Sequence, residues 1–414
     1  MSFRRNPAVA LALLTALNFF NYIDRYVLPA VQPLVQKELH RNDADMGWLT
    51  SVFFLFYMCV APFMGVLADR YSRKILICAG AVLWSGATLL TAVTTDYNSL
   101  LIRHTLVGVG EASFVTIAPS FIADLYPEHR RGRMLAIFYL AIPMGTAMGY
   151  VLGGHLGPIY GWRAPFMVAA IPGFLIAAAI AFLAEPERGR ADTLTVTPER
   201  ATVMGLLSNG AFLTATLGMA MMTFALGGLS VWMPTFLSRT RGMALNDANT
   251  LFGGSLLVSG FIATMIGGWL GDRLLRTRRD AYYRVSGVGM VLSLPFVVLA
   301  IYHQGRLMFP AIFLALFFLL LNTGPLNAAI INAVAAPIRG TAIAINIFII
   351  HILGDVPSPR LIGYISDKTG SLPKGFVVAV IAVAVSAIVL FYGSRFAPQI
   401  RQDILDGDAS GAHA

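Results

Sequence analysis

Ionisable side chains stand inside stretches of this sequence that are otherwise apolar. They are Asp24, Arg25, Arg103, Glu111, His351, Asp355 and Arg360. An uncompensated charge in the middle of a bilayer costs at least about 2.5 kcal/mol, so such residues should pair or face a water-filled cavity. Carboxylates in that setting often relay protons. We therefore expect Asp24, Glu111 and Asp355 to take part in proton coupling.

The positions of four of these charges predict how they pair. At 1.5 Å per residue, Asp24 lies about 24 Å along its expected helix, and Arg103 lies about 8 Å into a helix entering from the opposite side. Across an apolar core of about 30 Å, the two side chains reach similar depths. Arg103 and Glu111 are about 12 Å apart along one helix, too far for contact. We expect Asp24 to pair with Arg103 and Arg25 with Glu111. A purely structural set of ion pairs is the alternative.

Guanidinium, indole, amide and imidazole groups in the same stretches are candidates for substrate contact. The predicted substrate-binding residues are Arg25, Arg103, Trp232, Asn322, His351 and Arg360. Trp232 precedes Pro234 near an expected helix end, where it is either an interfacial anchor or a cavity wall. Asn322 either lines a cavity or bonds a neighbouring helix. A lone histidine in a helix is more often a packed residue than a ligand.

A repeated motif marks two corresponding helix ends, with a glycine followed by Asp-Arg and a further basic residue. The first copy runs from Gly65 to Lys74, and the second runs from Gly268 to Arg276, about half the chain later. This offset predicts two duplicated six-helix halves. The pattern resembles the signature loop of the major facilitator superfamily. The predicted gating residues are Asp69, Arg70, Arg73, Asp124, Asp272, Arg273 and Arg276. Arg73 is expected to pair with Asp124, and a simple cytoplasmic anchor is the alternative role for the motif.

The elements that hold these residues must be membrane helices. The 414 residues are 57% hydrophobic and 12% charged, whereas soluble domains carry roughly 25% charged residues. Backbone groups in lipid must be satisfied internally, and apolar runs of about 20 residues do this as helices. The expected spans are 8–36, 46–69, 75–95, 98–125, 134–157, 164–184, 204–237, 248–273, 283–303, 307–335, 341–363 and 375–395. The predicted fold is an all-α polytopic membrane protein with twelve transmembrane helices in two pseudo-symmetric six-helix bundles.

The distribution of charge predicts the topology. The expected parts are a first bundle (1–184), a cytoplasmic linker (185–203), a second bundle (204–396) and a cytoplasmic tail (397–414). Most of the 30 Lys and Arg residues lie on the side of the termini, so the positive-inside rule places both termini in the cytoplasm of a cell (inner) membrane protein. The first span is expected to be retained rather than cleaved as a signal peptide. The net charge of +9 then requires no nucleic acid.

Other classes of function find little support in the sequence. Cys59 and Cys78 lie inside apolar runs, with no disulfide framework or metal-ligand spacing. There is no nucleophile elbow, metal-binding motif or P-loop. We therefore expect no enzymatic activity, no cofactor and no direct ATP drive.

Four segments resemble the Spinster family of transporters, and short loops and tails resemble its bacterial members. They are Asn21–Arg25, Arg103–Pro127, Ile137–Gly145 and His351–Asp367. The resemblance implies movement of amphiphilic lipids such as lysophospholipids or sphingosine-phosphate-like molecules. It assigns Asp24, Arg25, Arg103, Glu111 and Asp355 to coupling or head-group contact. Arg360 departs from the family pattern, because it adds a charge where an uncharged residue is expected.

The leading hypothesis is therefore a proton-sensitive lipid transporter working by alternating access. The expected partners are the amphiphilic substrate, protons and membrane lipids, and the protein is expected to be a monomer. One alternative is a proton-coupled transporter of small organic anions or drugs, which soluble acids would inhibit whatever the acyl length. Another is a non-transporting sensor, which would give no flux, or a lipid scramblase.

Overall fold

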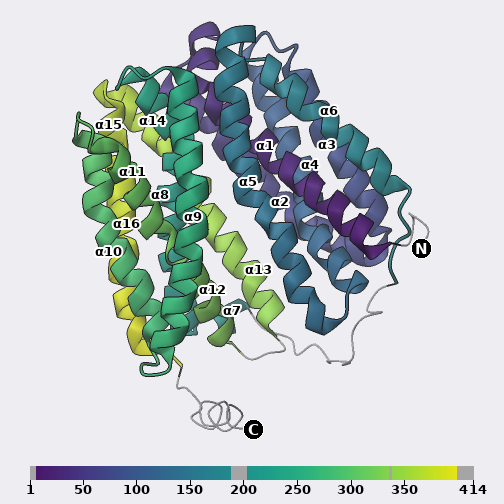
Figure 1. Cartoon of the computed structure of the whole chain (residues 1–414), viewed down its shortest axis with the longest axis vertical. Helices are drawn as coiled ribbons and strands as arrows, with labels where there is room; N and C mark the ends of the chain where they lie inside the picture. The colour runs from purple at the N-terminus through teal and green to yellow at the C-terminus, as the bar shows by residue number, and fades with distance from the viewer. Residues whose placement is uncertain (1–5, 188–202, 335–337, 399–414) are drawn as a thin grey trace. The chain divides into compact units, whose positions relative to one another are not determined.

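The computed structural model describes residues 6–187, 203–334 and 338–398 (Figure 1). Within these ranges the chain is helical and contains no β-strand. Twelve helical segments of the described chain are long and apolar enough to cross a membrane. The predicted all-α fold with twelve spans is thus confirmed. Residues 188–202 of the predicted linker and residues 399–414 of the predicted tail lie outside the described ranges.

The helices of the first half of the chain each form one predicted span. They are α1 (Pro7–Glu38), α2 (Asp43–Arg70), α3 (Arg73–Thr91), α4 (Tyr97–Leu125), α5 (Glu128–Tyr160) and α6 (Ala164–Ala181). The second half is more interrupted. Its helices are α7 (Val203–Leu207), α8 (Gly210–Arg239), α9 (Leu245–Leu275), α10 (Ala281–Tyr302), α11 (Met308–Leu320), α12 (Thr323–Asn332), α13 (Arg339–Ile350), α14 (Ser358–Thr369), α15 (Leu372–Gly375) and α16 (Val377–Gly393).

The contacts divide the chain into two compact units. The first contains residues 1–195 together with Gly227–Leu257 and Asp355–Val378, and the second contains the remaining segments. The first unit thus includes parts of α8 and α9 and the whole of α14 and α15, which belong to the second half of the sequence. The predicted boundaries at 184 and 203 stay a prediction.

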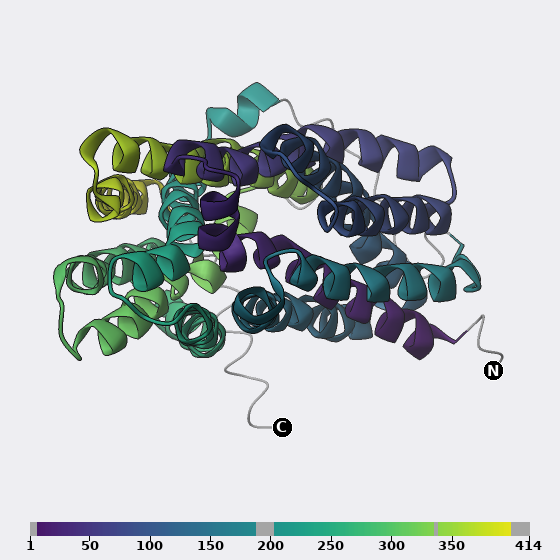
Figure 2. The same ribbon diagram turned by 90° about the horizontal axis from the view of Figure 1, so that it is seen from above.

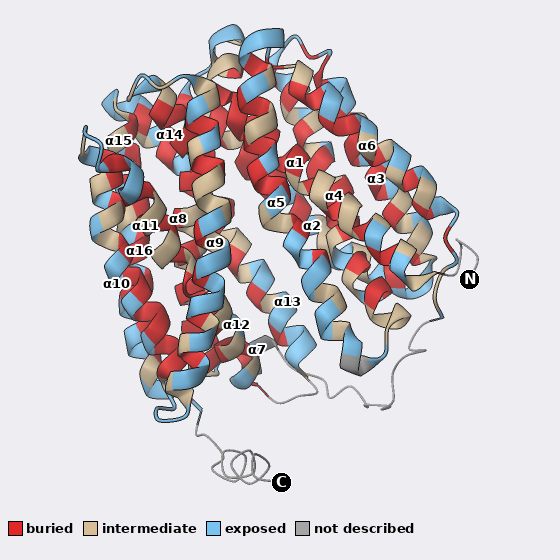
Figure 3. Ribbon diagram, in the orientation of Figure 1, coloured by how far each residue is buried: buried red, intermediate tan, exposed pale blue. Residues whose placement is uncertain are grey.

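In the first unit, α1 lies beside α5 and α6, and α4 lies beside α2 and α3 (Figures 1 and 2). Aromatic rings fill its core, where Phe114 packs against both Trp84 and Phe138. Each of these helices carries buried residues on one side and exposed residues on another (Figure 3). That pattern is expected of helices that pack on one face and meet lipid on the other.

Glycines bring α5 close to α1. A Cβ atom at Gly145 would lie 2.4 Å from the carbonyl oxygen of Phe19, and one at Gly149 would lie 2.8 Å from that of Ile23. Small residues at four-residue spacing allow such close packing of membrane helices. This contact fixes the part of α1 that carries Asp24 and Arg25.

In the second unit, hydrogen bonds tie the helices at buried positions. Tyr283 of α10 donates to the carbonyl of Ala211 on α8 at 2.5 Å, and Ser386 of α16 donates to that of Gly218 at 2.7 Å. Asn209 separates the short α7 from α8, and its side-chain oxygen accepts the Phe212 N–H. The predicted span 204–237 is therefore two helices.

Two other predicted spans of the second half are also interrupted. The span predicted at 307–335 divides into α11 and α12 at Leu321–Asn322. Pro325 has no N–H to donate to the carbonyl of Leu321, which weakens an uninterrupted helix there. The span predicted at 341–363 contains a π-helix, His351–Asp355, between α13 and α14. Pro357 and Pro359 follow it and likewise cannot donate backbone hydrogen bonds.

Candidate functional site

An ion pair joins α1 to α4 within the first unit. Arg25 donates from Nη2 to Glu111 Oε2 at 2.6 Å and from Nε to the same oxygen at 3.1 Å. Arg25 is 8% exposed and Glu111 is 0% exposed. The predicted pairing of Arg25 with Glu111 is confirmed. Burial makes this pair sensitive to loss of one partner, because the remaining charge would stay out of water.

Aromatic rings surround the guanidinium group of Arg25. Its Cζ atom lies 4.7 Å from the ring centroid of Tyr22, 5.0 Å from Tyr57, 5.1 Å from Phe53 and 5.7 Å from Phe54. Cations are attracted to aromatic faces at such distances, more strongly when both are desolvated. Arg25 therefore has two sources of support, one carboxylate and several rings, and only the carboxylate can change its charge.

Asp24 lies next to Arg25 in the chain but has a different environment. Its carboxylate is 3% exposed and lies beside Thr88 of α3. Arg103 instead donates to the carbonyl of Leu90 and to Oγ1 of Thr94, near the end of α3. The predicted pair of Asp24 and Arg103 is wrong. Similar depth did not bring them together, because depth along a helix leaves its rotation undetermined.

The second half of the chain contributes Asp355 to the first unit. Asp355 ends the π-helix and is buried. A Cβ atom at Gly227 of α8 would lie 2.2 Å from its Oδ1 atom, so only glycine allows α8 to approach the carboxylate this closely. Short π-helices inside α-helices occur frequently at functional sites. His351 begins the same π-helix and is half-buried. Their coupling and binding roles stay predictions.

The remaining predicted substrate contacts are engaged with protein groups. Trp232 is fully buried and donates from Nε1 to the carbonyl of Pro359 at 2.8 Å. Arg360 is exposed, and its Cζ atom lies 4.1 Å from the ring centroid of Trp48. Asn322, in the second unit, is buried with Nδ2 3.7 Å from the Met290 sulfur. Their roles in binding substrate remain predictions.

The first copy of the repeated motif anchors the start of α3. Arg73 donates from Nη1 to Asp124 Oδ2 at 2.6 Å and from Nη2 to the carbonyl of Pro186 at 3.2 Å. Its backbone N–H donates to Glu185 at 2.7 Å. The predicted pairing of Arg73 with Asp124 is confirmed. Asp69, which precedes it at the end of α2, is exposed, as is the adjacent Arg70.

The second copy has different contacts. Asp272 accepts a hydrogen bond from the Tyr282 hydroxyl at 2.8 Å. Arg273 lies over the Trp269 ring at 5.3 Å, and Arg276 is exposed. The two copies therefore share a sequence pattern but not a pairing scheme. A gating role for either copy stays a prediction.

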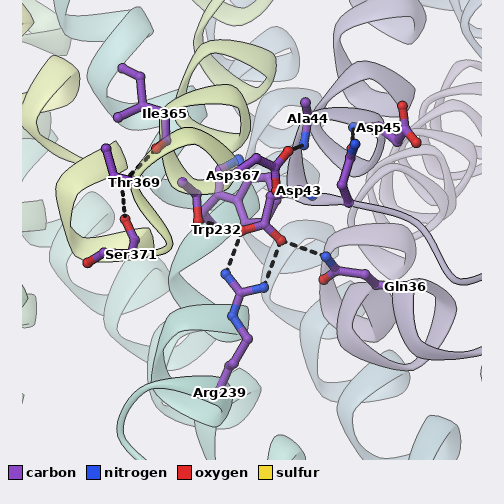
Figure 4. Close-up of polar contacts among 12 residues, drawn as sticks. Gln36, Asp43, Ala44, Asp45, Trp232, Arg239, Ile365, Asp367, Thr369 and Ser371 are labelled. Carbon is purple, nitrogen blue, oxygen red and sulfur yellow. Dashed lines mark hydrogen bonds and ion pairs between the residues drawn. The ribbon is translucent and has the colours of Figure 1, made fainter.

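Sequence reasoning missed a polar cluster around Asp43, which we call the Asp43 cluster. It contains Gln36, Asp43, Arg239 and Asp367 (Figure 4), together with Ser366. Asp43 lies just before the predicted span 46–69 and is not among the predicted site residues. The available signal was Asn42, whose side chain caps α2 by accepting the Asp45 N–H at 2.8 Å.

Comparison with known proteins identifies the family of the chain. The family model of the Major Facilitator Superfamily matches residues 14–359. Protein spinster homolog 1 of Xenopus laevis is 35% identical over 391 residues, which are 89% of this chain and 74% of that protein. The sphingosine-1-phosphate transporter of Danio rerio is 34% identical over 392 residues, 88% of this chain and 77% of that protein.

A solved structure shares the fold. It is the crystal structure of a bacterial homologue of the human lysosomal transporter Spinster, in an inward-facing and unoccupied conformation. Its TM-score is 0.85 at 23% identity, covering 94% of this chain and 97% of that one. The fold and the matched family define a multi-pass membrane transporter rather than an enzyme. The chain belongs to the Spinster family of the major facilitator superfamily.

Proposed function

We propose that this protein moves an amphiphilic lipid, a lysophospholipid or a sphingosine-phosphate-like molecule, across the membrane by alternating access coupled to protons. The observation that carries the coupling is the buried pair of Arg25 and Glu111, with a second buried carboxylate at Asp24. The lipid substrate is supported by the relative from Danio rerio, which is named a sphingosine-1-phosphate transporter.

The arrangement around Arg25 supports a mechanism that links substrate to proton. An anionic head group that approaches Arg25 competes with Glu111 for the guanidinium. Once released from Arg25, the buried Glu111 carboxylate binds a proton more readily, because burial disfavours its charged form. Substrate and proton affinities are then linked reciprocally. The aromatic rings hold Arg25 in place while its anionic partner changes.

Residues outside the pair of Arg25 and Glu111 also have roles in this proposal. Asp355 provides a titratable group from the second half, and Arg103 lies near one end of α4 as a second basic contact. The two copies of the Asp-Arg motif, with Arg73 paired to Asp124, act in gating at the cytoplasmic side. In this proposal the protein is a monomer in a cell membrane, with both termini in the cytoplasm.

Reconstitution into liposomes tests the proposed substrate. Initial flux of a lysophospholipid, of sphingosine-1-phosphate and of a soluble organic anion is measured with and without a proton gradient. We expect lipid flux that responds to the gradient and to acyl length. The Arg25→Ala variant should lose it, whereas Arg41→Ala, which removes a more exposed arginine, should keep it.

Different results identify the alternatives. Inhibition by soluble acids without dependence on acyl length identifies an organic-anion transporter. Lipid movement that depends neither on the proton gradient nor on Arg25 identifies a scramblase. Absence of any flux, in protein that remains folded, identifies a sensor.

A further inference from the structure

The Asp43 cluster joins segments from the two halves of the sequence. Gln36 and Asp43 lie at the end of α1 and the start of α2, whereas Arg239 ends α8 (Figure 4). Ser366 lies in α14. The bonded residues are separated by 196 positions for Asp43 and Arg239 and by 323 for Asp43 and Ser366. These contacts explain why the end of α8 and the whole of α14 belong to the first compact unit.

Every acceptor position of the Asp43 carboxylate is engaged. Arg239 donates to both oxygens, at 2.7 and 2.6 Å, in a bidentate pair. Gln36 donates to Oδ1 at 2.6 Å and Ser366 to Oδ2 at 2.5 Å. A carboxylate has about four acceptor sites, so this buried group is fully satisfied by partners from both halves.

A second carboxylate, also from the other half of the sequence, caps the start of α2. Asp367 of α14 accepts the backbone N–H groups of Asp43 at 2.9 Å and Ala44 at 2.8 Å. The first N–H groups of a helix have no partner within it, and an anion there is favoured by the helix dipole. The start of α2 therefore depends on a side chain from the other half of the sequence.

Backbones also meet without intervening side chains at this end of α2. A Cβ atom at Gly47 would lie 2.3 Å from the carbonyl oxygen of Pro359. One at Gly363 would lie 2.3 Å from the carbonyl oxygen of Asp43. The contact is close enough to exclude water, and any larger side chain at either glycine would force α2 and α14 apart.

We propose that the Asp43 cluster is a gate that holds one end of the transporter shut, and that Asp43 and Arg239 must separate for that end to open. The pairs of Arg25 with Glu111 and Arg73 with Asp124 each lie within the first half, so they can persist when the halves move. The Asp43 cluster cannot persist when the halves move, because its residues come from both halves. The assignment goes beyond the proposed function, because it does not depend on the identity of the substrate or on protons.

Thiol accessibility tests the gate without measuring transport. Cys59 and Cys78 are replaced by alanine, and a reporter cysteine is placed at Ser51, which is fully buried one helical turn beyond Gly47. In detergent or nanodiscs, a charged thiol reagent reaches both ends of the protein. We expect Asp43→Asn and Arg239→Gln each to speed labelling of the reporter by about tenfold or more, the equivalent of about 1.4 kcal/mol.

The double variant should be labelled little faster than either single variant, because both remove the same interaction. Asp45→Asn is the matched control. It removes a carboxylate two residues from Asp43. That carboxylate pairs with Arg41 at 3.7 Å, so its ion pair lies within the first half. Labelling rates unchanged by Asp43→Asn and Arg239→Gln, or raised equally by Asp45→Asn, would overturn the assignment.

A steric wedge provides an independent route to the open state. Gly47→Leu should also speed labelling at Ser51, whereas Gly254→Leu should not, since no atom lies within 4 Å of a Cβ at Gly254. A second reporter at Ser286, which is as fully buried as Ser51, detects general unfolding. Acceleration at Ser51 alone supports the gate, and equal acceleration at Ser286 overturns it.

Discussion

Replacing Glu111 with glutamine distinguishes a structural ion pair from one that couples transport to protons. Glu111→Gln keeps the size of the side chain but leaves Arg25 as a buried cation beside a neutral amide. Removing one partner of a buried pair costs about 3–5 kcal/mol. The rings around Arg25 remain and each contributes about 0.5–2 kcal/mol to a nearby cation. We therefore expect a loss of stability near the lower limit, about 3 kcal/mol.

The double variant Arg25→Met, Glu111→Gln removes both charges. Replacement of a whole buried pair by groups of similar volume is often neutral for stability. We therefore expect the thermal midpoint in detergent to fall in Glu111→Gln and to recover in the double variant. Initial flux across pH 5 to 8 should lose its pH dependence in Glu111→Gln, and the double variant should not regain it.

Recovery of both quantities in the double variant would refute the coupling role and leave the pair purely structural. The control is Arg41→Met, Asp45→Asn, which removes a more exposed pair with a 3.7 Å separation. Exposed pairs contribute about 0–1 kcal/mol. That control should leave the midpoint and the pH profile close to those of the wild type.

Four further predictions concern other parts of the chain. Asp355→Asn should reduce initial flux while expression is retained, and normal flux would remove Asp355 from the coupling groups. Asp69→Asn should shift cysteine accessibility toward opening at the predicted cytoplasmic end with little change in thermal midpoint. Arg73→Gln should lower the free energy of unfolding by about 3 kcal/mol, because it removes the ion pair with the Asp124 carboxylate. Unchanged labelling in Asp69→Asn would exclude the latch. Trp232→Phe should lower stability by about 1 kcal/mol by removing its hydrogen bond to Pro359, and an unchanged unfolding midpoint would contradict this.

The fold was predictable because hydropathy and membrane thickness act on each helix separately. Every predicted span has a counterpart among the described helices. The pairs of Arg25 with Glu111 and Arg73 with Asp124 were also predictable, since buried opposite charges in one membrane bundle have few other partners. The breaks near Asn322 and in His351–Asp355 were harder to place, because proline weakens a helix without fixing where it stops.

Contacts that depend on rotation about a helix axis were not predictable. Asp24 and Arg103 reach similar depths, yet Asp24 lies beside Thr88 and Arg103 bonds the end of α3. The Asp43 cluster escaped prediction for a related reason. Asp43 and Arg239 lie at helix ends, where charge is compatible with water and gives no signal of burial. Only the packing of α2 against α14 shows that Asp43 is enclosed.

The two kinds of buried carboxylate in this protein have separable thermodynamic effects. Glu111 pairs within one half, so in the proposed mechanism changing its charge alters the affinity of that half for protons or an anionic substrate. Asp43 pairs across the halves, so in the proposed gate changing its charge alters the equilibrium between closed and open states even without ligand. A ligand shifts that equilibrium only by its difference in affinity for the two states. A weakened Asp43 cluster should therefore change the apparent affinity for substrate by the change in population of the binding state, while leaving the proton linkage through Glu111 intact.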